Sequence, residues 1–356
     1  MFRPTASCIW NAFRSSGKRH LLLTGGRGSG KTTLFSALFP QPLPGITTRA
    51  LPGTGVCLTE NGTSRTVQIG LFDETLPGPE NRMRPLTAGF ADLGIPALER
   101  CYHTDSEWVS IDEIGYLEST NLPFQQAIRN LMEHKRLLAV IRKQEVPFLQ
   151  ELLQREEVFV IDLDAPYGNL GCVIMASGLG VRFGGNKLMA DFHGRPLIQR
   201  ALDATEGIFS RRVVVTRHED VAALCRAQEI PVALHSLPHR SDTVRLGLEA
   251  LGDAIDGCAF CPGDQPLLRR ETVAALALAA AHDPQAIWRL AYQDTVGTPV
   301  LFPRQLFPEL KNLPEGRGGG SLANKYPELV RTVPVRDAYE LKDADSRDDL
   351  TVLLEQ

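Results

Sequence analysis

The 356-residue sequence has no long apolar run and no large excess of either charge. No window approaches the roughly 18 apolar residues that a membrane-spanning helix needs, so a transmembrane protein is not expected. With 38 basic and 42 acidic side chains the net charge is −4, and the chain lacks the broad basic surface that attracts nucleic acid. Neither a membrane nor a nucleic acid is therefore an expected partner.

Cysteine is also scarce, because only seven residues are spread from Cys8 to Cys261. An odd number in so long a chain does not make the dense disulfide framework of a small secreted domain, so a reducing cytoplasm is the expected location. The first 20 residues lack acidic side chains, which is loosely like a transit peptide, but they have no secretory apolar region with a cleavage site. We expect residues 1–17 to form a frayed, solvated extension.

What the sequence does contain is an alternation of short β-rich apolar runs with longer amphipathic stretches. This alternation is typical of parallel sheets covered by crossover helices. A single core stops growing near about 250 to 300 residues, so two domains are expected. The cluster of Pro, Gly and Asn at residues 164–171 predicts the boundary. We therefore predict two three-layer α/β/α domains, over residues 18–165 and 170–356.

The β-rich runs give the expected strands. In the first half they occupy residues 20–25, 66–73, 108–113, 136–141 and 158–163. In the second half they occupy residues 172–177, 211–216, 231–234, 257–261, 286–292 and 329–335. Apolar residues spaced by three and four predict helices over residues 86–102, 122–136 and 270–283.

A phosphate-binding motif follows the first expected strand. Residues 25–32, GGRGSGKT, satisfy G-x(4)-G-K-[ST] between a strand and a helical run, which is the context that the motif requires. Backbone N–H groups would surround the β-phosphate, Lys31 would reach the β and γ oxygens, and Thr32 would ligate Mg²⁺. The residues predicted to bind this nucleotide are Gly25, Gly28, Ser29, Gly30, Lys31, Thr32 and Thr33.

An acidic pair ends the expected strand at 108–113. Asp112 would hold Mg²⁺, usually through water, and Glu113 would polarise the water that attacks the γ-phosphate. The alternative is an exposed acidic pair at a strand end, but the upstream P-loop favours the magnesium interpretation. Arg27 and Arg49 are candidates for stabilising transition-state charge, or they are solvated loop arginines.

With these motifs, residues 20–165 resemble the small nucleoside-triphosphatases related to the thermophilic P-loop NTPases. That family carries GxxGxGKTT, a G-x-x-T loop and DEIG followed by an acidic residue, found here at residues 25–33, 45–48 and 112–118. The resemblance implies a P-loop NTPase fold that hydrolyses ATP, GTP and other NTPs with Mg²⁺. Lys31 and Glu113 would then be the catalytic residues.

The second half opens with a Gly-rich loop that is not a P-loop. The expected strand at 172–177 leads into residues 178–188, GLGVRFGGNKL. Because the loop lacks G-x-G-x-x-G spacing with a well-placed acid, dinucleotide binding is disfavoured. Arg182 and Lys187 would bind a triphosphate and neutralise the charge on a pyrophosphate leaving group. A charged surface loop is the alternative.

Other polar residues lie where the same ligand would bind. Asp264 follows the strand at 257–261, on the edge where open α/β sheets bind ligands, and a carboxylate there can hold Mg²⁺. Ser241 opens a helix with Arg245 one turn later, which suits contact with ribose or phosphate. A surface role for Arg245 is the alternative.

These strings resemble the molybdenum-cofactor nucleotidylyltransferases over residues 172–356, and more closely their cytidylyl branch. Their signature, hydrophobic-x-A-[AGS]-G-x-x-x-R-[FM]-G-x-x-K, is met between Ile174 and Lys187. Such enzymes transfer NMP from an NTP to the terminal phosphate of molybdopterin and release pyrophosphate. The resemblance implies a Rossmann-like nucleotidyltransferase fold that binds CTP or GTP through Met175, Ala176, Ser177, Gly178, Arg182, Lys187, Ser241 and Arg245.

The same resemblance assigns the chemistry. Arg182, Lys187 and Asp264 would be catalytic, with Asp264 as metal ligand and Asp343 or Asp345 as a candidate second acid. Ser177 stands where the cytidylyl branch has Ala and the guanylyl branch has Gly, which favours CTP over GTP. Residues 317–320, RGGG, replace the expected GAR-type turn, so the acceptor stays open.

Two other features are interpreted as structural. Cys258 and Cys261 have C-x-x-C spacing, but they lie inside an expected buried strand and favour core packing over zinc or redox chemistry. His235 and His239 are interpreted as solvated or capping residues because the eight histidines form no ligand cluster.

Our leading hypothesis is a bifunctional maturation enzyme that nucleotidylates a molybdopterin-type phosphate and hydrolyses NTPs in its first domain. Its expected partners are that small molecule and an apo molybdenum hydroxylase. One alternative keeps the transfer but uses a sugar 1-phosphate or polyol phosphate. Another is a nucleotide-switched chaperone that escorts the cofactor to an apo-enzyme.

Overall fold

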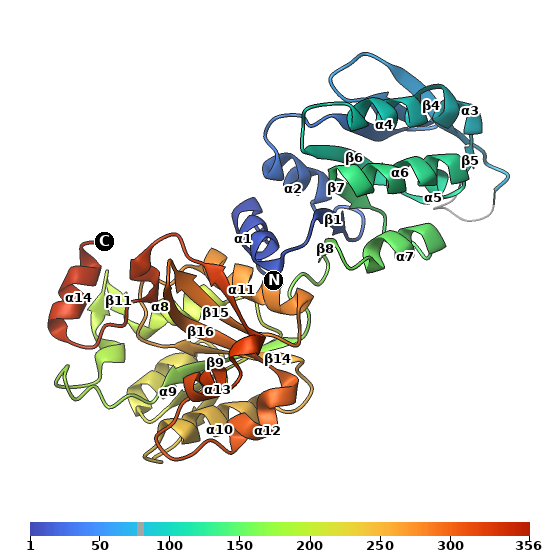
Figure 1. Ribbon diagram of the computed structural model, residues 1–356. Coiled ribbons are helices and arrows are strands. Elements are labelled where there is room, and N and C mark those ends of the chain that lie inside the picture. Colours follow the sequence, from blue (N-terminus) through green and yellow to red (C-terminus); the bar gives the residue numbers. More distant parts are fainter. Residues whose placement is uncertain (77–81) are drawn as a thin grey trace. The chain divides into compact units, whose positions relative to one another are not determined.

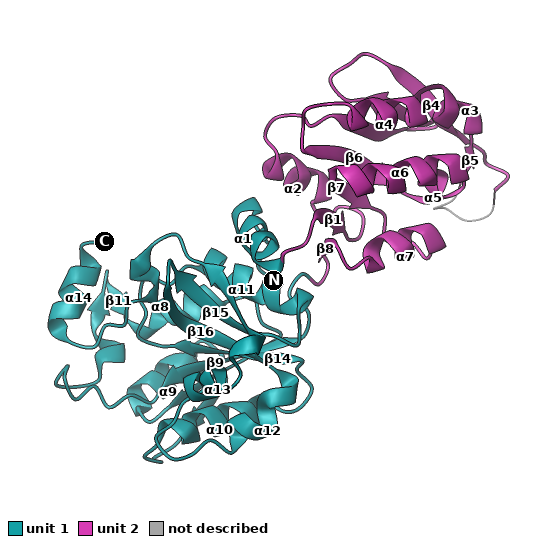
Figure 2. Ribbon diagram, viewed as in Figure 1, with its two compact units in different colours: residues 1–16, 166–356 teal, residues 17–165 magenta. Residues whose placement is uncertain are grey.

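The computed structural model, which describes residues 1–76 and 82–356, divides the chain into two units (Figures 1 and 2). The small unit comprises Gly17–Ala165. The large unit comprises Met1–Ser16 together with Pro166–Gln356. The small unit is therefore inserted in the chain between the first helix and the rest of the large unit.

The N-terminal segment belongs to the large unit, so the expectation of a frayed extension is wrong. Residues Ala6–Ser16 form helix α1, which packs on α11 (Arg270–His282) and β17 (Val330–Pro334) (Figure 1). Its buried side chains are Cys8, Ile9, Ala12 and Phe13. Their spacing places them on one face of the helix, and this apolar stripe is what holds α1 against its neighbours.

The small unit is built on an eight-stranded sheet in the order β5-β4-β3-β2-β6-β7-β1-β8. The strands are β1 (His20–Thr24), β2 (Gly45–Leu51), β3 (Gly55–Glu60), β4 (Thr66–Phe72), β5 (Met83–Pro85), β6 (Trp108–Ile114), β7 (Arg136–Ile141) and β8 (Val158–Asp162). The five strands predicted here are confirmed, whereas β2, β3 and β5 are additional. From β2 to β5 the pairing is antiparallel, because the connections are too short for crossover helices. The expectation of parallel pairing holds only from β2 through β6, β7 and β1 to β8.

Helices cover this sheet and enclose its core. They are α2 (Lys31–Leu38), α3 (Thr87–Gly89), the π-helical turn Phe90–Gly94, α4 (Ile95–Tyr102), α5 (Tyr116–Ser119), α6 (Leu122–His134) and α7 (Pro147–Gln154). The main core lies between the sheet and α4, α6 and α7. Helix α2 packs on β1 and β7, so the P-loop that precedes it is fixed to the centre of the parallel strands.

The large unit contains a seven-stranded sheet in the order β13-β12-β9-β14-β16-β15-β17. Besides β17 its strands are β9 (Leu170–Ala176), β12 (Arg211–Thr216), β13 (Val232–Leu234), β14 (Gly257–Pro262), β15 (Ile287–Tyr292) and β16 (Thr295–Pro303). The six predicted strands are confirmed. The additional strand β16 runs antiparallel to β14 and β15, because only two residues join it to β15.

Buried apolar clusters hold the large unit together. Its remaining α-helices are α8 (Ile198–Thr205), α9 (Glu219–Ala227), α10 (Arg240–Leu251), α12 (Phe307–Lys311), α13 (Gly320–Lys325) and α14 (Arg347–Leu354). One cluster lies between the sheet and α10, α12 and α13, while α11, which buries residues 272–280, packs on β15 and β16. A second cluster fastens α14 to the Gly-rich loop, and its buried members are Phe183, Phe192, Leu197, Ala344, Leu350 and Leu353.

Across the described residues, every helix is too short or too polar to cross a lipid bilayer.

Candidate active sites

The P-loop of the small unit joins β1 to α2. Gly25, Gly28 and Gly30 have φ angles of 140°, 77° and 96°, a backbone region that favours glycine. The Lys31 ammonium donates to the carbonyl oxygens of Gly25 and Gly26, at 2.8 Å each. Ser29 Oγ is buried and has no hydrogen-bond partner among the described residues, while Thr32 and Thr33 are exposed. The loop therefore presents hydroxyl groups and Lys31 from one short turn.

A carboxylate outside the motif holds the P-loop in place. The Gly26 N–H donates to both Asp164 oxygens, at 3.1 and 2.9 Å. Lys143 Nζ lies 2.9 Å from Asp162 Oδ2 and 2.9 Å from Asp164 Oδ2. Hydrogen bonds from Lys143 and from Gly26 lower the pKa of Asp164. Sequence analysis missed Lys143 and Asp164, because only the folded sheet brings the ends of β7 and β8 to the loop.

The acidic pair Asp112 and Glu113 lies near the end of β6, which is separated from β1 by β7 in the sheet. Burial and the neighbouring charge of Glu113 raise the pKa of Asp112, while the charges of Arg49 and Lys31 oppose that rise. Thr48 Oγ1 accepts the Glu113 N–H at 3.2 Å and holds the backbone of the pair. The structure thus places Asp112 within electrostatic reach of Lys31, as a shared magnesium and phosphate site requires.

Glu113 points toward a different cation. Its Oε1 lies 3.2 Å from Nε of Arg142, the residue directly after β7. Below it, the buried Glu118 carboxylate accepts the Gly115 N–H at 2.7 Å, and burial raises the pKa of Glu118 to about 7. A small pocket is lined here by Thr48, Ala50, Val56, Glu113, Gly115, Tyr116, Leu117, Glu118 and Arg142. Arg142 is a third residue that sequence analysis missed.

In the large unit, Lys187 is the centre of a charged cluster. Its side chain is only 9% exposed, and its Nζ lies 2.6 Å from Asp264 Oδ2 and 2.8 Å from Asp345 Oδ1. Arg182 contacts the other oxygen of Asp345, at 2.6 Å. Burial alone would lower the pKa of Lys187, but the charges of Asp264 and Asp345 outweigh burial and raise it. The predicted residues Arg182, Lys187 and Asp264 therefore lie together.

Asp343 completes this cluster from the same C-terminal segment as Asp345. Burial and the charge of Asp264 raise the pKa of Asp343, whereas the hydrogen bond from Lys187 lowers the pKa of Asp345. Gln265 Nε2 donates to Asp343 Oδ1 at 2.9 Å. Three carboxylates thus converge around one buried ammonium group.

The start of the Gly-rich loop is held by two histidines. Met175 and Ala176 end β9, and Ser177 Oγ lies 2.8 Å from Nε2 of His235. His235 Nδ1 accepts the Leu237 N–H at 3.2 Å, so the neutral ring carries its proton on Nε2 and donates to Ser177.

This contact corrects the interpretation of His235 as a solvated or capping residue. His235 is partly buried, and its burial lowers its pKa. His218 Nε2 donates to the Gly178 carbonyl at 2.8 Å. His239, by contrast, is the N-cap residue of α10, as a capping role implies.

Ser241 and Arg245 do not join the Lys187 cluster. Helix α10 begins at Arg240, so Ser241 lies inside its first turn and is buried. Arg245 forms ion pairs within its own helix, at 3.1 Å to Glu249 and 3.4 Å to Asp242. These contacts favour the surface role for Arg245.

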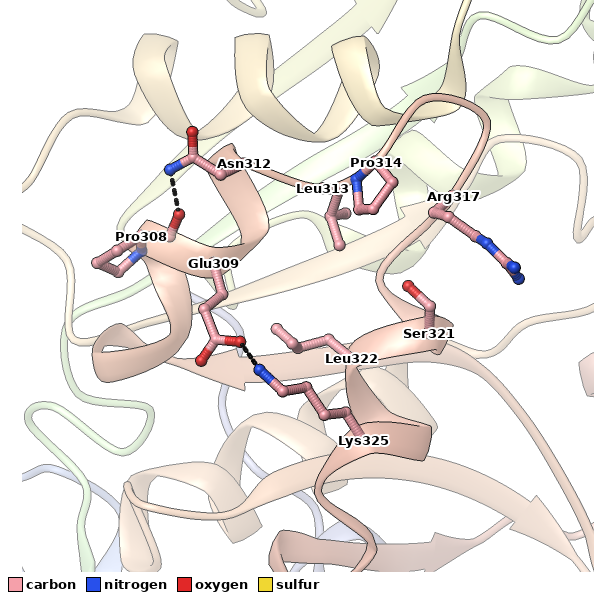
Figure 3. A pocket seen from close by; sticks show the side chains of 9 residues that line it. All are labelled: Pro308, Glu309, Asn312, Leu313, Pro314, Arg317, Ser321, Leu322 and Lys325. Carbon is pink, nitrogen blue, oxygen red and sulfur yellow. Dashed lines mark hydrogen bonds and ion pairs between the residues drawn. The ribbon is translucent and has the colours of Figure 1, made fainter.

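A pocket of the large unit lies elsewhere, between α12 and α13 (Figure 3). Its volume is about 590 Å³. The lining residues are Pro308, Glu309, Asn312, Leu313, Pro314, Arg317, Ser321, Leu322 and Lys325. No predicted site residue lines it, its acid Glu309 is paired with Lys325 at 2.5 Å, and Arg317 extends away from it. The predicted chemistry therefore does not depend on this pocket.

The cysteine pair is part of the core, as its structural interpretation implies. Cys258 and Cys261 are fully buried, and Cys261 Sγ lies 3.6 Å from Cys172 Sγ. Burial raises the pKa of Cys258 well above its ordinary value, which keeps the thiol protonated. Within residues 1–76 and 82–356 no three His, Cys, Asp or Glu side chains are grouped to hold a metal ion by themselves.

The fold and these clusters define a protein with two nucleotide-handling α/β units, a P-loop unit and a nucleotidyltransferase-like unit. Comparison with known families agrees. The family described as NTPase matches residues 78–166, and the family described as MobA-like NTP transferase domain matches residues 172–330. The chain therefore combines an NTPase domain of the THEP1 type with a MobA-like NTP transferase domain.

Individual relatives match one unit or the other. Nucleoside-triphosphatase THEP1 of Thermotoga maritima is 26% identical over 159 residues, which are 40% of this chain and 86% of that protein. The 3-deoxy-manno-octulosonate cytidylyltransferase of Neisseria gonorrhoeae is 33% identical over 91 residues, or 24% of this chain and 36% of that protein. The crystal structure of Rv0371c from Mycobacterium tuberculosis H37Rv is similar with a TM-score of 0.48 and 24% identity, covering 53% of this chain and 99% of that chain.

Proposed function

We propose that the large unit transfers CMP from CTP to the terminal phosphate of a molybdopterin-type acceptor, while the small unit hydrolyses NTPs. The observation that carries the transfer chemistry is the buried ammonium of Lys187 between Asp264 and Asp345. A cation held this firmly beside carboxylates is suited to binding a metal-bridged triphosphate. The acceptor itself rests on the resemblance of residues 172–356 to the cofactor nucleotidylyltransferases.

In the proposed reaction an acceptor phosphate oxygen attacks the α-phosphorus of the nucleotide. The bond from the α-phosphorus to the bridging oxygen of the β-phosphate breaks, and pyrophosphate leaves. Arg182 and Lys187 would contact the β and γ phosphates and stabilise the negative charge that builds on them. Backbone groups from Met175 to Gly178 would pack against the nucleotide, because Ala176, Ser177 and Gly178 have small side chains.

Mg²⁺ fits the donor groups of both units. Magnesium is commonly held by one or two carboxylates together with substrate phosphates. In the large unit Asp264 with Asp343 or Asp345 would hold it, and the pKa of Asp343 is raised by burial and by the neighbouring charge of Asp264. In the small unit Thr32 and Asp112 would hold it. The ion would neutralise phosphate charge in each site.

Three side chains would take part in NTP hydrolysis in the small unit. Lys31 would exchange its hydrogen bonds to the carbonyl groups of its own loop for contacts with the β- and γ-phosphate oxygens. Glu113 would accept a hydrogen bond from the attacking water, and Arg49, which already acts electrostatically on Asp112, would face the same phosphates. The proposed setting is the cytoplasm, and an apo molybdenum hydroxylase is the proposed recipient of the product.

The acceptor is tested by measuring pyrophosphate release from CTP, GTP, UTP and ATP with molybdopterin, sugar 1-phosphates, polyol phosphates and sugar acids. The assay uses the Lys31→Ala variant, because hydrolysis by the small unit would otherwise consume the nucleotide. We expect release that requires molybdopterin and is fastest with CTP. The cytidylyltransferase relative makes a sugar acid the rival acceptor, and turnover with sugar substrates but not with molybdopterin would favour that rival.

The two sites are separated by matched variants. Asp264→Asn is expected to abolish nucleotidyl transfer and spare NTP hydrolysis, and Lys31→Ala is expected to do the reverse. If both variants kept full turnover but lost binding to an apo molybdenum hydroxylase, the chain would instead be a nucleotide-switched chaperone.

A further inference from the structure

Two consecutive basic residues follow β7. One contacts Glu113 of the acidic pair, and the other contacts the carboxylate that holds the P-loop. Arg142 pairs with Glu113 at 3.2 Å, while Lys143 pairs with Asp164 at 2.9 Å. Asp164 in turn accepts the N–H of Gly26 in the P-loop. Successive side chains of an extended segment point to opposite sides, so one dipeptide can make both contacts.

The contact between Arg142 and Glu113 is built by three local features. The Arg142 N–H donates to the Ile114 carbonyl at 2.9 Å, which continues the pairing of β7 with β6 beyond the strand end. Gly115 leaves room for the arginine stem, because a Cβ at that position would lie 3.0 Å from Arg142 Cδ. Thr48 fixes the backbone of Glu113, so rotation of the glutamate side chain is the freedom that remains.

Arg142 limits that freedom. Among the described residues, Arg142 is the side chain that forms an ion pair with Glu113. The side chains of Arg142 and Glu113 are 43% and 28% exposed, so solvent screening makes the pair a weak contributor to stability. Its effect should therefore be on the direction of the carboxylate rather than on folding.

We propose that Arg142 is a positioning residue for NTP hydrolysis, which aims the Glu113 carboxylate, while Lys143 and Asp164 set the P-loop for nucleotide binding. This inference rests on the proposed role of Glu113 toward the attacking water. It divides the site into a part that controls the chemical step and a part that controls affinity. Displacing a catalytic group by about 1 Å can lower a rate roughly a hundredfold, so such control does not require a strong pair.

The test is steady-state hydrolysis of ATP and GTP by the full chain. Arg142→Ala is expected to lower kcat about tenfold or more with little change in KM, and Arg142→Lys, which keeps a cation, should recover part of kcat. Lys143→Ala is expected to raise KM more than it lowers kcat. The matched control is Arg129→Ala, which removes a pair to Glu151 at 2.7 Å on α6 and α7 of the same unit and should leave both constants unchanged.

The outcomes separate the inference from the function on which it rests. If Glu113→Gln leaves hydrolysis intact, the proposed role of Glu113 fails. If Glu113→Gln abolishes hydrolysis but Arg142→Ala behaves like Arg129→Ala, or raises kcat, the positioning role is overturned. A fall in kcat that tracks a lower melting temperature, and that Arg142→Lys does not relieve, would also overturn it.

Discussion

At the scale of single residues, the charged groups divide into those that local sequence can place and those that only the fold can place. Lys187 and Asp264 each follow an apolar strand, so they could be assigned to one sheet edge from spacing alone. Lys143 and Asp164 belong to no motif and meet the P-loop only because β7 and β8 end beside it. Tertiary charge pairs of this kind leave no periodic signal in the sequence.

Removing the central cation of the large unit should destabilise that unit as well as inactivate it. Lys187→Met would leave Asp264, Asp343 and Asp345 close together without their buried partner, at a cost of about 2 to 4 kcal/mol at pH 7. The lowered pKa of Asp345 means that its pairing stabilises the fold above its unfolded pKa and is lost as pH falls through the folded value. The difference in the free energy of unfolding between wild type and variant should therefore become smaller at acidic pH.

Chemical denaturation of both proteins at pH 7 and pH 3 measures this difference in the free energy of unfolding. Lys325→Met, which removes the exposed pair with Glu309, is the control and should change stability little at either pH. An equal difference at the two pH values would contradict the pairing of Lys187 with ionised carboxylates.

His20 should make the small unit sensitive to mild acid. Burial, with the nearby charge of Arg19, lowers the pKa of His20 to about 4, and its Nδ1 accepts the Leu137 N–H at 3.1 Å. Because the folded pKa lies below the unfolded value of about 6.5, stability is full above that pH and declines as pH falls toward 4. The total loss is roughly 3 kcal/mol.

Hydrogen exchange at β1 and β7 between pH 7 and pH 4.5, corrected for intrinsic rates, reports this decline. His20→Asn retains a hydrogen-bond acceptor but cannot titrate, so its pH dependence should be shallower than that of wild type. Identical profiles for the two proteins would show that another group governs the acid response.

At the scale of elements, strands with continuous apolar runs were predictable and half-exposed strands were not. Strand β2 ends in three exposed residues, Arg49, Ala50 and Leu51. It therefore lacks the continuous apolar run by which a buried strand is predicted. Strand β16 contains Gly297 and Pro299, which argue locally against a strand, yet a nine-residue strand forms because β14 and β15 flank it. Neighbouring strands overrode local preference in both cases.

Helix α14 should control the transferase site although it supplies no ligand. Leu353 is 2% exposed in the small cluster that joins α14 to Phe183 of the Gly-rich loop, and the same C-terminal segment carries Asp345. Leu353→Ala should cost about 2 to 3 kcal/mol locally and loosen the contact between Asp345 and Arg182.

We expect this variant to raise KM for CTP and to leave NTP hydrolysis by the small unit unchanged. The exposed Val352, one position earlier, gives the control Val352→Ala. Equal effects of the two substitutions on nucleotidyl transfer would show that the packing of α14 does not control the site.

At the scale of the whole molecule, the order of the chain differs from a simple tandem fusion. A boundary near residues 164–171 was readable from its Pro, Gly and Asn, whereas the return of residues 1–16 to the large unit was not. The amphipathic pattern of α1 extends over only 11 residues, and its partners α11 and β17 lie more than 250 residues later in the sequence. No local pattern can identify a partner at that separation.

Helix α1 should therefore stabilise the large unit and leave the small unit unaffected, although it precedes the small unit directly. Phe13 is 2% exposed between α1 and its neighbours, so Phe13→Ala should cost about 3 kcal/mol. Hydrogen exchange should accelerate in α11 and stay unchanged in β1 and β7, and Lys31-dependent hydrolysis should persist. The exposed Arg14 on the same helix provides the control Arg14→Ala. Faster exchange in β1 rather than α11 would mean that α1 supports the small unit, and the assignment of residues 1–16 to the large unit would be wrong.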